Sequence, residues 1–267
     1  MKPKSTEELY QQLENDYFGE NMQEKEELIS FQRILNGVNL FIDAGASLGQ
    51  YAYFANQHLT NARVVCIEAD SLRFPRLQEL LSKWNEGSTN KLEAVHAAVS
   101  NEDGHATFYE TNDSLCGGLH QYWNSEEKSE YGQISPKAVS VRCITLDEYF
   151  KDQTPDLIKI DVEGAEFRAV SGAQGLLRAR KTRFAVEMHP WGDKTLGKTT
   201  PDVFKLFHSY NYNFNRLHKL WHFYPNTSLF PLWPKYQFTQ LVMGSNFLRP
   251  LAKKVMKLFR GKNHPTS

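Results

Sequence analysis

The sequence predicts an α/β domain whose mostly parallel sheet is covered by helices on both faces. Short apolar segments alternate with amphipathic helical patterns through the middle of the chain, which is typical of repeated βαβ units. The length of 267 residues is enough to bury a sizeable core in one domain with additions. A content of 40% hydrophobic and 23% charged residues indicates an ordinary globular protein.

Net charge and cysteine usage exclude several classes of protein. Lys plus Arg and Asp plus Glu number 31 each, so no global charge argues for a nucleic-acid partner. Cys66, Cys116 and Cys143 are scattered, which fits a reducing compartment and neither a disulfide framework nor a zinc site. The first residues lack the apolar segment of a secretory signal, and no run approaches the roughly 18 apolar residues of a membrane span. A cytoplasmic protein is therefore expected.

The expected elements follow the chain in order. Residues 1–36 have a helical pattern and are predicted to form an N-terminal extension, followed by the main domain at 37–247. Residues 106–110 and 138–146 are expected to pair as an antiparallel addition to the sheet. The other strands are expected at 40–46, 62–70, 92–100, 155–161, 182–189, 212–217 and 237–245, and helices at 49–59, 74–84 and 163–180.

Two segments depart from this alternation. Residues 111–137 are polar and turn-rich, so an inserted lid-like loop is predicted, with a surface excursion as the alternative. Residues 248–267 are basic and carry an apolar stripe if they are helical. Such a tail could make a peripheral contact with an anionic membrane surface, while a docked helix or a solvated tail remains the other interpretation.

A glycine-containing loop follows the first apolar segment. Gly45 and Gly49 let a ligand approach the backbone closely at the carboxyl end of a strand and near a helix N-terminus. Glu68 ends the second strand nineteen residues after Gly49. A carboxylate there can accept hydrogen bonds from both hydroxyls of a ribose, so this half of the domain is predicted to bind a nucleoside.

Two residues of the loop decide between nucleoside cofactors. A dinucleotide fingerprint needs glycines where this chain has Asp43 and Leu48, which counts against NAD. A P-loop is excluded because no Gly-Lys-Ser or Gly-Lys-Thr follows. An acidic residue at position 43 suits a cationic ligand, which favours S-adenosylmethionine with its positive sulfonium and ammonium groups.

Polar residues at later strand ends are candidates for chemistry. Asp161 ends a strand that is otherwise apolar, and the strand direction would aim it into the crevice. Glu187 and His189 are two residues apart on a strand, so they share one face. His189 is the predicted general base, because an ordinary histidine pKa near 6.5 lets it take a hydroxyl proton near neutral pH. Asp161, Glu187 and His189 are therefore the predicted catalytic residues.

Two further acidic residues lie at the expected start of a helix. The helix dipole favours carboxylates there, and this structural explanation is preferred for Glu166, whereas Glu163 stays open. Asp161, Glu163, Glu187 and His189 together also offer hard oxygen ligands and one imidazole. A divalent cation of the magnesium type therefore remains open, beside simple charge compensation or hydrogen bonding to a sugar.

Six segments resemble the FkbM-like methyltransferases and occur in that family's order within residues 38–190: FIDAGASLGQYAYFA, CIEAD, AAVSNEDGHATFY, TLDEYF, DLIKIDVEGAE and VEMH. The resemblance implies a class I, Rossmann-like fold and methyl transfer from S-adenosylmethionine to oxygen, commonly of a sugar or polyketide hydroxyl. By position, Glu68 would contact the ribose, and Ala97 and Ala98 would lie near the adenine, where many class I enzymes have an Asp. The residues implied at the methionine end are Asp43, Gly45, Ala46, Ser47, Gly49 and Gln50.

An O-methyltransferase is the leading hypothesis, with two alternatives. N-methylation usually calls for an aromatic and proline-rich motif after the fourth strand, where this chain has residues 161–164 (DVEG). A catalytically silent binding module of a glycan-assembly complex is the other alternative, against which the intact glycine loop and Glu68 argue. The aromatic residues at 221–234 suit either a sugar-binding wall or packing at the edge of the core.

Overall fold

The computed structural model describes residues 25–111, 117–119, 128–129, 132–133 and 136–227. The chain divides into a unit that ends at Pro225 and a second unit, Asn226–Ser267, of which only the first two residues are described. Several predictions lie outside the described residues: most of the N-terminal extension, most of the lid-like loop, the strand at 237–245 and the basic tail at 248–267.

Seven strands form the main sheet, and helices connect them. The strands are β1 (Leu40–Ala44), β2 (Arg63–Glu68), β3 (Lys91–His96), β9 (Leu157–Ile160), β10 (Arg183–Glu187), β11 (Tyr212–Leu217) and β12 (Leu220–Pro225). The helices are α2 (Lys25–Gln32), α3 (Gln50–His58), α4 (Phe74–Asn85), α5 (Leu146–Tyr149), α6 (Glu166–Ser171), α7 (Gln174–Ala179) and α8 (Thr200–Ser209).

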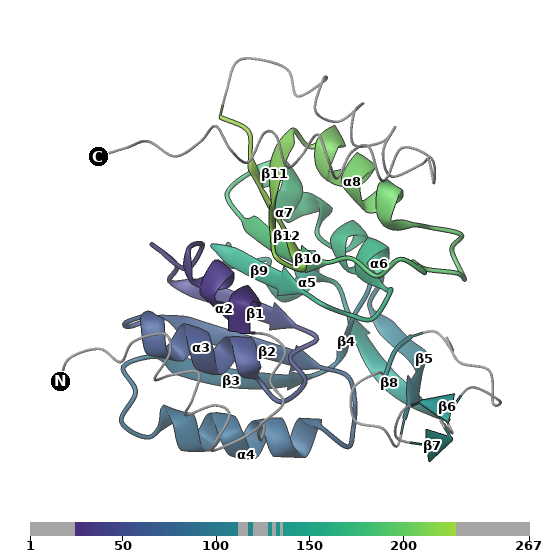
Figure 1. Cartoon of the computed structure of the whole chain (residues 1–267), viewed down its shortest axis with the longest axis horizontal. Coiled ribbons are helices and arrows are strands. Elements are labelled where there is room, and N and C mark those ends of the chain that lie inside the picture. Colours follow the sequence, from purple (N-terminus) through teal and green to yellow (C-terminus); the bar gives the residue numbers. More distant parts are fainter. Residues whose placement is uncertain (1–24, 112–116, 120–127, 130–131, 134–135, 228–267) are drawn as a thin grey trace. The chain divides into compact units, whose positions relative to one another are not determined.

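The order of strands in the main sheet explains where a ligand can bind. The order is β11-β12-β10-β9-β1-β2-β3, and β12 alone runs antiparallel to its neighbours (Figure 1). From β1 the chain adds β2 and β3 on one side, and later adds β9 and β10 on the other. The carboxyl ends of β1 and β9 therefore flank a topological switch point, where open α/β sheets bind their ligands. The predicted fold class, a mostly parallel α/β sheet of the class I type, is confirmed.

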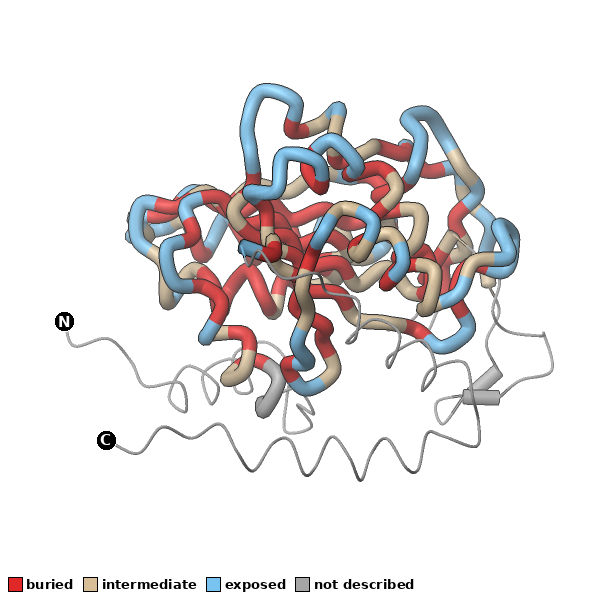
Figure 2. The backbone as a smooth tube through the Cα atoms, turned by 90° about the horizontal axis from the view of Figure 1, so that it is seen from above, coloured by how far each residue is buried: buried red, intermediate tan, exposed pale blue. Residues whose placement is uncertain are grey.

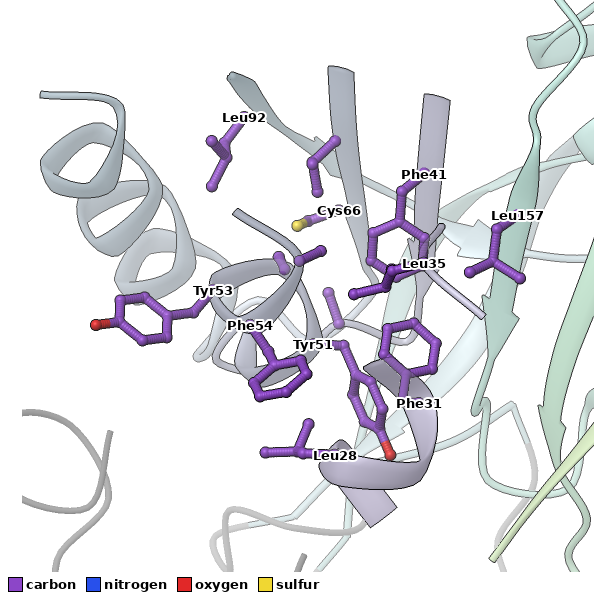
Figure 3. Packing of buried hydrophobic residues seen from close by; sticks show 14 of the residues in the cluster. Leu28, Phe31, Leu35, Phe41, Tyr51, Tyr53, Phe54, Cys66, Leu92 and Leu157 are labelled. Atoms are coloured by element: carbon purple, nitrogen blue, oxygen red, sulfur yellow. The ribbon is translucent and has the colours of Figure 1, made fainter. Parts of the chain in front are cut away.

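The core lies on both faces of this sheet, and Figure 2 shows the buried segments gathered in the middle of the described chain. On one face Phe31 of α2 and Tyr51 of α3 pack edge to face, and Phe31 also meets Phe41 of β1 (Figure 3). On the other face Phe207 of α8 stacks on Phe223 of β12, with ring centroids 3.8 Å apart. These aromatic contacts fix the strands whose ends carry the site.

A small second sheet stands beside β3. It has the order β4-β8-β5, with β4 (Ala98–Val99), β5 (Gly104–Glu110) and β8 (Lys137–Ile144), and the predicted antiparallel pairing of β5 with β8 is confirmed (Figure 1). The prediction of one strand over 92–100 is wrong. The N–H of Ala97 donates to the carbonyl of Glu68 at the end of the β2–β3 ladder, after which Ala98 pairs with Cys143 in the second sheet. Two short strands, β6 (Lys128–Ser129) and β7 (Gly132–Gln133), also pair with each other.

The single helix predicted over 163–180 is two helices, α6 and α7. Gly172 lies between them against the chain at Ser100, where a Cβ would stand 2.1 Å from the Ser100 carbonyl oxygen. The Asp147 carboxylate then accepts hydrogen bonds from the N–H groups of Gly175 and Leu176 and so caps the start of α7. The predicted helices at 49–59 and 74–84 are confirmed as α3 and α4.

The chain closes the main sheet with a hairpin. The predicted strand at 212–217 is confirmed as β11, and its partner β12 follows after a two-residue turn. His218 takes φ 54° in this turn. In β12 Trp221 and Phe223 are buried, which favours the core interpretation for the described part of 221–234. Among the helices of the described residues, none is long and apolar enough to cross a membrane.

Candidate active site

The glycine loop is fixed between two strand ends. Gly45 has φ 76°, and a Cβ there would stand 1.7 Å from the carbonyl oxygen of Asp161, so only glycine fits this position. The N–H groups of Gly45 and Ala46 both donate to the carbonyl of Ile67 in β2, at 2.9 and 3.1 Å. These contacts hold the loop against β2 and against the chain at Asp161.

Glu68 is anchored by the loop that it faces. Its Oε2 accepts a hydrogen bond from the Ser47 N–H at 2.6 Å, and its Oε1 accepts one from the Asp70 N–H at 2.8 Å. The residue is only 5% exposed, and burial raises the pKa of its carboxyl above the ordinary value. Each carboxylate oxygen keeps a second lone pair, so the anchored group can still accept hydrogen bonds from a diol.

One pocket of about 400 Å³ joins this loop to the ends of β9 and β10. That volume is within the range of small-molecule sites. Its apolar wall includes Val99 of β4, Phe108 of β5 and Leu119, which follows the bridge between Gly118 and Tyr109. The predicted site residues that line it are Gly45, Ser47, Gln50, Glu68, Ala97, Ala98, Asp161, Glu187 and His189.

Three predicted cofactor residues do not line the pocket. Asp43 is fully buried beneath the loop, and Ala46 belongs to the hydrophobic core. Gly49 is the N-cap residue of α3, and a Cβ there would stand 2.9 Å from the side chain of Leu77. All three residues support the loop from its buried side. The family resemblance implied instead that they contact the cofactor directly.

Lys159 of β9 is a site residue that the sequence interpretation missed. It is 3% exposed, and its Nζ lies 3.3 Å from Asp43 Oδ1 and 3.3 Å from Asp161 Oδ2. It also donates to the carbonyl of Gly45 at 3.2 Å and lies over the ring of Tyr51. Asp43 is completely buried, and the contact with Lys159 compensates its charge. A lysine inside the apolar run LIKI was the available signal.

The opposite end of the pocket is acidic. His189 Nδ1 lies 2.7 Å from Glu166 Oε1, and the same oxygen accepts the Gly164 N–H at 2.8 Å. His189 Nε2 lies 3.4 Å from Glu163 Oε2 and 4.0 Å from Asp161 Oδ1. Glu166 is 3% exposed, so its place is not explained by the helix dipole alone, as the sequence suggested. It orients the imidazole of His189.

Burial and mutual repulsion shift the pKa values of this acidic end. Burial raises the pKa of Glu163 to about 7 and also raises that of Glu187, to which the charge of Asp161 adds. Burial by itself would lower the pKa of His189, but its hydrogen bond to Glu166 and the nearby carboxylates raise it to about 9. The ordinary value near 6.5 assumed from the sequence is therefore wrong for His189, which keeps its proton at neutral pH in the unliganded protein.

This arrangement can do three things chemically. Clustered carboxylates favour a cationic ligand group, and His189 can exchange a proton at Nε2. Asp161, Glu163 and His189 each place one ligand atom within 4.8 Å of the others, so these three residues could hold a metal ion.

Comparison with known proteins identifies a family. A family model described as the methyltransferase FkbM domain matches residues 43–214, which is more than half of the chain. A search of curated proteins found no match.

Solved structures of methyltransferases are also similar to this chain. Methyltransferase FkbM from Methylobacillus flagellatus KT is 18% identical with a TM-score of 0.46, over 82% of this chain and 58% of that one. Precorrin-6y C5,15-methyltransferase from Geobacter metallireducens GS-15 is 11% identical with a TM-score of 0.44, over 79% and 93%. Aeropyrum pernix fibrillarin, solved with S-adenosyl-L-methionine, is 9% identical with a TM-score of 0.39, over 71% and 66%.

These scores leave the activity of this chain open, and the alignment spans little more than half of the Methylobacillus protein. The family match covers the end of β1 and all of β2, β9 and β10, whose ends carry the pocket. It thereby confirms the resemblance found in the sequence. The chain belongs to the FkbM methyltransferase family.

Proposed function

We propose that this chain transfers the methyl group of S-adenosylmethionine to a hydroxyl oxygen of a sugar, a glycan or a related acceptor. The observation that carries the proposal is that one pocket is lined both by Glu68 with the glycine loop and by His189. The acceptor class rests on family membership and on the carboxylates around the site, which suit a hydroxylated ligand.

The glycine-loop end suits the nucleoside. Glu68 is held by two backbone N–H groups and can accept the ribose hydroxyls, while Ala97 and Ala98 offer a flat apolar surface to the adenine. S-adenosylmethionine supplies an electrophilic methyl group on a sulfonium. At the other end burial raises the pKa values of Glu163 and Glu187 although His189 lies beside them, and the positive groups of this cofactor would favour the ionised carboxylates.

His189 is the proposed general base. Its Nδ1 is tied to Glu166, so Nε2 is the atom that faces Glu163 and Asp161 and can receive a hydroxyl proton. With a pKa of about 9, His189 must first lose its own proton. A bound cation nearby disfavours the imidazolium and so lowers this pKa, which couples cofactor binding to the appearance of the base.

The test is methyl transfer from S-adenosylmethionine labelled with ¹³C in its methyl group to a panel of methyl pyranosides and amino sugars. NMR of the product distinguishes a methoxy carbon from an N-methyl carbon. We expect a methoxy product that requires His189. An N-methyl product would instead establish the N-methyltransferase alternative. Binding of the cofactor without transfer to any acceptor would favour the silent binding module.

A divalent cation is a second element of the proposal, because Asp161, Glu163 and His189 could share one. The same assay decides it. Loss of transfer after treatment with EDTA, reversed by magnesium, would support a metal-assisted reaction. Full activity in EDTA would show that the reaction needs no metal ion. The carboxylates would then act only by charge compensation and hydrogen bonding.

A further inference from the structure

Trp191 is an exposed aromatic side chain beside the proposed base. It is 41% exposed and is one of three large hydrophobic residues exposed in the described part of the chain, with Leu72 and Leu196. Its ring centroid lies 4.8 Å from that of His189, and the two ring planes are inclined by 41°. Exposure of an indole next to a catalytic candidate suggests a ligand contact, because such a ring otherwise tends to be buried.

The backbone holds Trp191 in one place. Residues 189–192 form a tight turn, in which the N–H of Gly192 donates to the carbonyl of His189 at 3.2 Å. Thr200 Oγ1 donates to the same carbonyl at 3.1 Å. Gly192 has φ 58°, and a Cβ there would stand 2.4 Å from the carbonyl oxygen of Lys198. Binding of a ligand to Trp191 therefore requires little further ordering of the backbone, so the entropic cost of binding is small.

Hydrogen bonds also hold the loop that follows Trp191. Asp193 Oδ1 accepts hydrogen bonds from the N–H groups of Thr195 and Leu196 at 3.1 and 3.0 Å. Asp193 Oδ2 accepts one from Arg168 Nε of α6 at 2.6 Å. Because α6 also carries Glu166, which orients His189, the indole and the imidazole are positioned by the same helix.

We propose that Trp191 is the stacking platform of the acceptor subsite and binds the apolar face of a sugar ring. This inference rests on the proposed function. The electron-rich face of an indole attracts C–H groups, and one face of many pyranoses presents several of them. Hydroxyls at the rim of such a ring can meet His189 Nε2 and the carboxylate of Glu163, which lie 3.4 Å apart. The subsite thus combines an apolar platform with polar acceptors, which selects cyclic over acyclic polyols.

The experiment measures binding of two defined probes to the protein saturated with S-adenosylhomocysteine. Ligand-observed NMR titrations with methyl β-D-glucopyranoside and with D-glucitol compare a ring with an open chain of similar hydroxyl content. We expect the pyranoside to bind about tenfold more tightly than glucitol, and Trp191→Ala to remove this difference by weakening pyranoside binding about tenfold. Trp191→Phe keeps a flat ring and should retain most of the preference.

Leu196→Ala is the matched control, because Leu196 is also 41% exposed and lies in the same loop. It should leave both titrations unchanged. If the wild type binds no pyranoside, or if Trp191→Ala binds it as tightly as the wild type, the inference is wrong.

Calorimetry of S-adenosylhomocysteine with each variant separates this inference from the proposed function. Cofactor binding should be the same in Trp191→Ala and in the wild type. If the wild type does not bind the cofactor, the proposed function fails, and the titrations repeated on the unliganded protein still decide whether Trp191 binds the sugar ring.

Discussion

The two ends of the pocket are stabilised in opposite ways. At the glycine-loop end, Glu68 accepts two backbone hydrogen bonds and Gly45 is fixed between two strands. At the acidic end, Glu163 and His189 have pKa values of about 7 and 9, far from the ordinary ones. The first end is complete without a ligand, whereas the second concentrates charge.

This difference indicates that the two ends of the pocket have different roles. The preformed glycine-loop end can bind the nucleoside of the cofactor with little reorganisation. The acidic end, where pKa values are shifted, changes its protonation when a cationic group binds. Lys159 joins the two ends, since its Nζ contacts both Asp43 and Asp161. Variants at either end, and at Lys159 between them, test whether the two ends act independently.

The largest effect is expected at the acidic end. His189→Asn should lower kcat by about 10² to 10⁴-fold, because it removes the proton acceptor. Cofactor affinity at neutral pH, measured by calorimetry, should not fall and should rise, because the variant has no imidazolium to oppose the positive cofactor. His105→Asn, at an exposed position of β5, is the control. A fall in cofactor affinity as large as the fall in kcat would contradict the separate roles given to the two ends.

Lys159 tests the connection between the ends. Lys159→Met should lower the free energy of unfolding by about 3–5 kcal/mol, because it leaves Asp43 buried without its ionic partner. Urea denaturation measures this. The double variant Asp43→Leu with Lys159→Met removes both charges and should recover most of the loss. A single variant as stable as the wild type would contradict the role given to this pair.

The loop conformation is tested by two glycines with similar φ angles. Gly37 has φ 72° and open space around its Cα, whereas a Cβ at Gly45 would collide with Asp161. Gly37→Ala should cost about 1 kcal/mol of stability from φ alone. Gly45→Ala should cost about 3 kcal/mol or more, because the strand ends must also separate. Equal losses would show that the close approach to Asp161 is unimportant.

The stability of the unliganded protein should depend on pH through His189. Its pKa is raised from 6.5 to about 9 in the folded protein, so its stabilising contribution is fully present below pH 6.5. That contribution is lost as the pH rises through 9, and it amounts to about 3 kcal/mol at most. Thermal unfolding between pH 6 and 9.5 should show this fall in the wild type.

Two variants check the assignment of this slope. His189→Asn should abolish the fall above about pH 8, where Glu163 with its pKa of about 7 is already ionised, and Glu166→Gln should reduce it because the hydrogen-bond partner is changed. A slope that persists in His189→Asn would place the titration in another group.

The sequence predicted some parts of this molecule because their signals are local. The run LFIDAGA combines a buried strand with a glycine loop, and Glu68 ends an apolar strand. The hairpin of β11 and β12 was missed because its turn, His218-Lys219, has neither glycine nor asparagine.

The acidic end of the site was understood less well, because its properties are not local. Glu166 looked like an ordinary helix start until the fold brought it to His189. Lys159 meets Asp43 only because β1 and β9 pair in register, and the pKa of His189 depends on carboxylates brought together by two strand ends. Trp191 became a candidate only when its exposure and its contact with His189 were known.

The most direct test of the account is a calorimetric titration with S-adenosylmethionine of the wild type, Glu68→Ala and the control Glu79→Ala, whose carboxylate is exposed on α4. We predict binding to the wild type and the control, no binding of NAD, and an affinity at least about tenfold lower for Glu68→Ala. Equal binding by wild type and Glu68→Ala, or no binding by well-folded wild type, would contradict the assignment of this pocket to the methyl donor.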